Sequence, residues 1–245
     1  MDSSTGMQLR RRLITAIFVI IIAFFPALAA AMLLYPGQDG HPGGYRFFHE
    51  FLSALGMTST KNGIANPISS WIFNLTLGIS MLALLPFWFF RSANVLRAWA
   101  RWLSFVCCSA FSLCVIGVAL TPYNLNPPVH NFFADSAFVF GALGILTMLV
   151  FTRKDYYSQT YKIGWLIFAI IALAGHGLAI FLEKTGHLPV IPTHPILQKL
   201  DVAIFTAWLC TELIVCKRSL EQEETKTQDL MDQSLDVCQT QAKLS

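Results

Sequence analysis

Long apolar runs separated by short polar segments dominate this chain. A run of about 20 apolar residues is long enough to cross a bilayer as an α-helix, at 1.5 Å per residue. The pattern therefore predicts six membrane-spanning helices, at Leu13–Tyr35, Ile68–Phe90, Trp102–Leu120, His130–Phe151, Ile163–Leu182 and Ile196–Cys216. It divides the chain into an N-terminal segment (1–12), a six-span domain (13–216) and a polar tail (217–245).

Composition supports this interpretation. The 245 residues are 55% hydrophobic and 13% charged, whereas a soluble domain carries about 25% charged residues. The formal charge is +3 and no basic block is present, so nucleic acid is not an expected partner, whereas membrane lipids are. The sequence predicts an all-α, polytopic integral membrane protein built as a six-helix bundle.

Basic residues predict the orientation, because Lys and Arg in short loops favour the cytoplasm. Alternate loops are rich in them, and the loops between carry few. Both termini are therefore expected in the cytoplasm, most simply at a bacterial inner (plasma) membrane. The residues on the expected cytoplasmic side are Arg10, Arg11, Arg12, Arg91, Arg97, Arg101, Arg153, Lys154, Lys162, Lys217 and Arg218.

The ends of the chain leave alternatives open. The first run resembles a cleavable signal peptide at Ala27-Leu28-Ala29, but its apolar stretch continues through Leu34, which favours a retained span. The tail is polar and without aromatic residues, so disorder is expected. The alternative there is a short amphipathic helix using Leu230, Met231, Leu235 and Val237.

The first outward loop, about Pro36–Asn66, contains a segment with helical periodicity. In Tyr45–Gly56, one stripe carries Phe48, Phe51, Leu52 and Leu55. The segment is too short to span, so we expect an amphipathic helix at the membrane interface or between the spans.

Ionisable groups within the runs are the strongest indication of function, since charge is costly in a bilayer and usually faces the bundle interior. Asp135 lies about five residues into the fourth run, or roughly 8 Å from its end, and Asp201 lies at similar depth in the sixth. Glu212 lies one turn from the end of that run and is expected to reach water or Lys217.

All six histidines fall on the expected outer side. At helical spacing, His49 aligns with Ser53 and His194 with Asp201. The hypothesis is an outward-facing polar cavity that binds a lipid or small molecule, lined by His49, Ser53, His130, Asp135, His194 and Asp201.

Three alternatives compete with that cavity. His49, His130 and His194 could hold Zn²⁺ in a membrane lipid hydrolase, although no HExxH motif supports a zinc site. A small transporter is a further alternative, although no inverted repeat is evident. In the third, these residues are structural and hydrogen-bond neighbouring helices.

Several short motifs resemble a known family. They are Phe51–Gly56, Asn66-Pro67, Trp71–Asn74, Pro122 and His130 at the fourth run, and Gln198–Leu200 with Trp208 in the sixth. The pattern is similar to the six-span membrane family called domain of unknown function 998, and more distantly to Frag/DRAM/Sfk proteins. The resemblance covers about residues 13–216 and implies a six-helix membrane protein without an established reaction. Ala54 stands where that family usually has an acidic residue.

Overall fold

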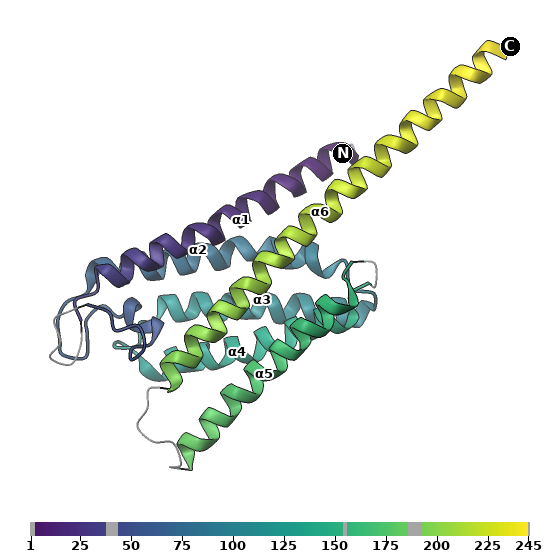
Figure 1. Cartoon of the computed structure of the whole chain (residues 1–245). Helices are drawn as coiled ribbons and strands as arrows, with labels where there is room; N and C mark the ends of the chain where they lie inside the picture. Colours follow the sequence, from purple (N-terminus) through teal and green to yellow (C-terminus); the bar gives the residue numbers. More distant parts are fainter. Residues whose placement is uncertain (1–2, 38–43, 154–155, 186–192, 245) are drawn as a thin grey trace.

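The computed structural model describes residues 3–37, 44–153, 156–185 and 193–244. They form an all-α protein with six long helices and one short 3₁₀ helix (Figure 1). The elements are α1 (Ser3–Leu33), η1 (Leu52–Gly56), α2 (Pro67–Ser92), α3 (Ala98–Leu120), α4 (Pro127–Phe151), α5 (Gln159–Lys184) and α6 (Thr193–Leu244).

Successive helices run up and down, so the bundle has two ends. At the loop end lie η1 and the segments 34–37, 44–66 and 121–126, and at the terminal end lie 93–97, 152–153 and 156–158. Helix α6 starts at the loop end, crosses the bundle and continues far beyond the terminal end (Figure 1).

Among the residues that the structure describes, four helices are long and apolar enough to cross a membrane. These candidate spans are Gln8–Leu33, Pro67–Ser92, Ala98–Leu120 and Pro127–Phe151. The chain is thus a multi-pass helical membrane protein. The prediction of six membrane spans is wrong, because only four of the six long helices in the described part of the chain are candidate spans. The described part of α5 gives a shorter apolar helix, Gln159–Ile171. The apolar part of α6 carries three charges, Lys199, Asp201 and Glu212.

The tail differs from the expected disorder. Helix α6 continues without a break to Leu244, giving 52 residues in one helix. No Gly or Pro follows Pro195, and Leu, Glu, Gln and Lys are good helix formers. The predicted amphipathic helix of Tyr45–Gly56 is also not formed. Only Leu52–Gly56 is helical there, and it forms a 3₁₀ helix.

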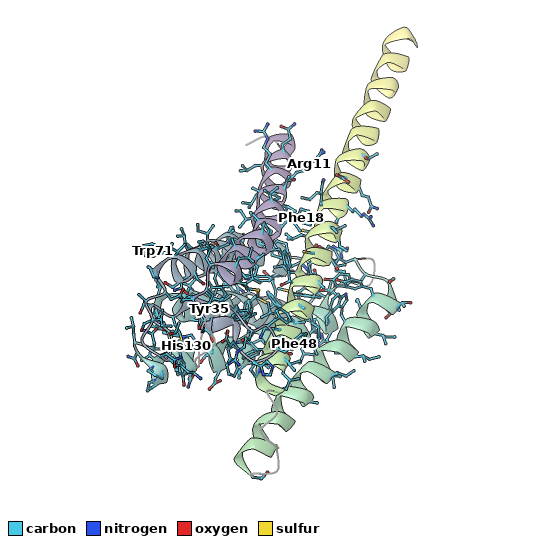
Figure 2. The ribbon with its side chains drawn as sticks, turned by 60° about the vertical axis from the view of Figure 1, so that its left-hand side comes forward. Arg11, Phe18, Tyr35, Phe48, Trp71 and His130 are labelled. Atoms are coloured by element: carbon cyan, nitrogen blue, oxygen red, sulfur yellow. The ribbon has the colours of Figure 1, made fainter. Side chains whose placement is uncertain are left out.

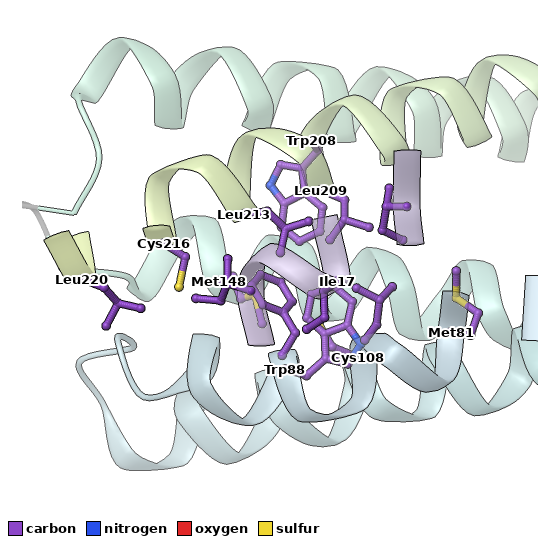
Figure 3. Close-up of a cluster of buried hydrophobic side chains, with 14 residues drawn as sticks. Ile17, Met81, Trp88, Cys108, Met148, Trp208, Leu209, Leu213, Cys216 and Leu220 are labelled. Atoms are coloured by element: carbon purple, nitrogen blue, oxygen red, sulfur yellow. The ribbon is translucent and has the colours of Figure 1, made fainter. Parts of the chain in front are cut away.

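The largest hydrophobic cluster lies where α6 crosses α1 and α2 (Figure 3). Trp88 of α2 and Trp208 of α6 stack with ring centroids 6.2 Å apart, and Ile17 of α1 packs into the same cluster. Trp88 is fully buried and donates its indole N–H to Ser112 Oγ over 2.8 Å. Buried aromatic area therefore anchors α6 to the bundle.

Helices α3 and α4 approach each other through glycines. A Cβ atom on Gly144 would lie 2.5 Å from Cys108 Sγ, and one on Gly117 would lie 2.6 Å from the Phe133 ring. Small residues at such positions let membrane helices approach closely and gain van der Waals contact.

Candidate functional site: the polar contacts and the groove of helix α6

A fully buried ion pair joins α6 to α2 near the terminal end. Arg91, in the last turn of α2, and Glu212, in α6, both have side-chain exposure of 0%. Arg91 Nε donates to Glu212 Oε2 over 2.5 Å. The expectation that Glu212 reaches water or Lys217 is therefore wrong, because helix packing gives it an arginine partner instead.

Hydroxyl groups complete this buried cluster. Arg91 Nη2 donates to Thr152 Oγ1 over 3.1 Å and to the Tyr157 hydroxyl, which in turn donates to Glu212 Oε1. Tyr161 of α5 donates to the same carboxylate oxygen over 3.2 Å. The Arg91 guanidinium also lies 4.7 Å from the ring centre of Tyr156. We call Arg91, Thr152, Tyr157, Tyr161 and Glu212 the arginine cluster.

The chemistry of the arginine cluster favours a structural lock. Its two charges cancel, and burial raises the pKa of Tyr157 well above its ordinary value, so this hydroxyl stays protonated and donates. A buried ion pair adds little net stability compared with apolar residues of the same volume, but removing one partner leaves a costly buried charge. The cluster therefore fixes the position of α6 against α2, Thr152 and Tyr157.

A second set of polar contacts holds α6 at the loop end. Lys199 Nζ donates to the Glu50 carbonyl and, over 3.1 Å, to that of Pro195. Gln198 Oε1 accepts the Leu52 N–H over 2.7 Å. We call these contacts of Lys199 and Gln198 the loop latch. They explain the missing helix over Tyr45–Gly56, because the Glu50 carbonyl and the Leu52 amide are committed to α6.

Lys199 is an unusual cation. Its ammonium group also lies 5.4 Å and 5.2 Å from the ring centres of Tyr45 and Phe47. It lies in the second turn of α6, outside the four candidate spans. Burial lowers the pKa of Lys199 to about 8, although the Glu50 carboxylate opposes that shift. Glu50 itself forms an ion pair with Arg46, at 3.7 Å.

The histidines of the predicted cavity have separate surroundings. His49 is exposed in a turn, and Ser53, in η1, is half-buried, so the two do not share one helix face as expected. His130 is buried at the start of α4, where its Nδ1 donates to the Thr121 carbonyl over 2.8 Å and its ring contacts Tyr123. His194 begins α6, but its side chain lies outside the described residues.

The two aspartates also differ from each other. Asp135 is exposed on α4, whereas Asp201 is half-buried in α6. Among the side chains that the structure describes, no group of three His, Cys, Asp or Glu is arranged to hold a metal. The proposed cavity and the zinc site stay predictions.

A groove of about 240 Å³ lies between α1 and α6 near the terminal end. Figure 2 shows α1, with Arg11 and Phe18 labelled, running beside α6. The apolar walls are Ile14 and Phe18 of α1 and Leu213 and Ile214 of α6. Polar groups line the rest of it: Thr15, Lys217, Arg218 and Glu221.

The arginine cluster and this groove share one segment of α6. Glu212 immediately precedes the wall residues Leu213 and Ile214, so the ion pair sets the position of that wall. The sequence analysis used Arg91 only as a marker of orientation, and Lys217 as such a marker and as an expected partner of Glu212. The signal that could have found them is that charges at the end of an apolar run need either water or a partner.

Comparisons with known proteins gave no match. The chain matches no family model, no curated protein and no solved structure.

Proposed function

We propose that this multi-pass membrane protein binds a membrane lipid in the groove between α1 and α6. The single observation that carries the proposal is the composition of the groove, which is apolar along four side chains and basic at one end. Lipid sites need this division, because an acyl chain gains from apolar contact while the headgroup needs polar partners.

The position of the groove supports a ligand drawn from the bilayer. One wall belongs to α1, which is a candidate span, and Val19, Ile22 and Phe25 on the same helix are exposed apolar residues. In a membrane those side chains face acyl chains. A lipid can therefore reach the groove from the side, without passing through the loop end.

This proposal keeps the predicted lipid partner and places it in a different part of the molecule. The binding cavity expected from the sequence lay among His49, His130 and Asp201, at the loop end, whereas the groove lies near the terminal end. The resemblance to the six-span family of unknown function, the cytoplasmic location of both termini and a bacterial inner membrane remain part of the proposal.

Filling the groove tests the proposal. Ile214→Trp places an indole between α1 and α6, and Ile167→Trp makes the same change at an exposed position on α5, away from the groove. The measurement is the number of phospholipids retained per protein, by native mass spectrometry in mild detergent. Wild-type protein and the α5 variant are expected to retain lipid that Ile214→Trp loses. Equal retention in all three proteins would contradict the proposal, as would wild-type protein that retains none.

A further inference from the structure

We infer that the lipid held between α1 and α6 is an anionic glycerophospholipid whose phosphate binds Lys217 and Arg218. The inference rests on the proposed function and names the class of lipid. Its evidence is the order of side chains along the two walls of the groove.

On α6 the wall changes from apolar to cationic within one turn. Leu213 and Ile214 line the apolar part, and Lys217 and Arg218 follow three to five positions later. That separation corresponds to about 4–7 Å along the helix axis. It matches the short distance between the first acyl carbons of a lipid and its phosphate, so both parts can bind at once.

Helix α1 repeats the same change in the same direction. Ile14 and Phe18 line the groove, whereas Arg10, Arg11 and Arg12 precede Ile14 by two to four positions. The Arg10 guanidinium lies 5.4 Å from the ring centre of Phe90, so it stays beside the bundle. The two cations that line the groove thus belong to α6, and α1 adds basic residues just beyond its own lining residues toward the terminal end.

The balance of charge selects the class of headgroup. Glu221 is the carboxylate at the groove, one turn beyond Lys217, and the two cations beside it leave a positive excess. A phosphodiester gains charge-assisted hydrogen bonds from Lys and Arg. A choline headgroup would bring its own positive charge to these cations. An anionic lipid is therefore favoured over a zwitterionic lipid with the same acyl chains.

The basic groups elsewhere at the terminal end agree with this choice. Arg97, Arg101 and Lys162 also lie there. Basic clusters beside a membrane surface attract anionic lipids, with roughly 1 kcal/mol for each Lys or Arg near the surface. Two cations at the phosphate, offset in part by the Glu221 carboxylate, therefore predict an enrichment on the order of tenfold.

The test offers the protein two lipids that differ in the headgroup alone. Full-length protein is placed in nanodiscs of equal parts phosphatidylglycerol and phosphatidylcholine with identical acyl chains, and the lipids that stay bound on extraction are counted. The variant is Lys217→Gln with Arg218→Gln. The control is Lys61→Gln with Arg46→Gln, which removes the same charge at the loop end, away from the groove.

We expect wild-type and control proteins to enrich phosphatidylglycerol about tenfold, and the groove variant to bind both lipids equally. Equal binding by the wild type, or an unchanged preference in the groove variant, would overturn the inference and leave lipid binding itself intact. Both the groove site and its choice of an anionic lipid are supported if Ile214→Trp loses all bound lipid and the wild type prefers phosphatidylglycerol. Absence of any retained lipid in the wild type would overturn both.

Discussion

Helices α3 and α4 associate in one way, and α6 joins the bundle in another. Between α3 and α4, glycines bring the backbones close, as at Gly144 against Cys108. Helix α6 is held by the arginine cluster, the loop latch and the tryptophan pair. Within a bilayer, close packing of small residues and interhelical polar contacts are two separate means of association, because lipid supplies no hydrophobic drive between helices.

The difference teaches what each region can tolerate. The close-packed interface between α3 and α4 does not tolerate added side-chain volume. A buried ion pair tolerates the loss of both partners better than the loss of one, because losing one partner leaves the other charge buried without compensation. Both apolar packing and the buried ion pair set the shape of the groove. Apolar side chains of α1 pack on α6, and Glu212 fixes the turn of α6 that carries Leu213 and Ile214.

Breaking the arginine cluster should have the largest effect. Glu212→Gln or Arg91→Gln leaves one uncompensated buried charge and should lower the free energy of unfolding by about 3–5 kcal/mol. The double variant Arg91→Met with Glu212→Leu should recover most of that loss. Unfolding in mixed detergent micelles with increasing dodecyl sulfate measures all three variants. A double variant as unstable as either single one would show that the charges themselves are needed.

Adding volume between α3 and α4 should have the next largest effect. Gly144→Ala forces Cys108 Sγ or the helix backbone to move and should cost about 1–3 kcal/mol. Gly78→Ala in α2 is the matched control, because a Cβ there meets nothing within 4 Å. The control should be neutral or slightly stabilising. Equal losses in the same unfolding assay would mean that close approach of α3 and α4 is not what Gly144 provides.

The loop latch should respond to pH. The pKa of Lys199 is about 8 in the folded protein, against 10.5 for an ordinary lysine. Between these values the unfolded state binds more protons, so stability should rise as the pH increases from 8 to 10. The rise should be on the order of 1 kcal/mol after solvent screening. Comparing wild type with Lys199→Met across this pH range isolates the effect, and parallel curves for the two proteins would refute it.

The smallest effect is expected at the edge of the loop latch. Arg46 pairs with Glu50 at 3.7 Å, and its side chain is 36% exposed. The Arg46 amide still donates to Glu50 Oε2 when the guanidinium is removed. Arg46→Gln should therefore change the free energy of unfolding by less than about 1 kcal/mol. A loss similar to that of Glu212→Gln would erase the distinction between the exposed pair and the buried one.

Much of the fold could be predicted from hydrophobic pattern alone. Each of the six long helices overlaps one predicted run, because long apolar segments have few alternatives to helix in a bilayer. The number of qualifying spans and the helix of the tail could not be predicted in this way. The three charges in the apolar part of α6 weaken its membrane signal, and the polar composition of 217–245 hid good helix formers.

The candidate site was predicted less well than the fold. Periodicity placed His49 and Ser53 on one helix, but the loop latch uses the backbone groups that such a helix needs. Glu212 drew attention as a charge in an apolar run, yet its partner Arg91 is 121 positions away. Spacing along one helix carries no information about which residue faces it from another.

The sequence by itself determined the class of this protein, a multi-pass bundle of apolar helices, and the basic character of its terminal end. Burial of apolar side chains and the cost of charge in a bilayer act on each segment separately, so they are visible in one dimension. Only the tertiary structure decided which charges meet and where a groove opens. Those depend on the distance and rotation between helices, which close glycine contacts, stacked tryptophans and one buried ion pair set together.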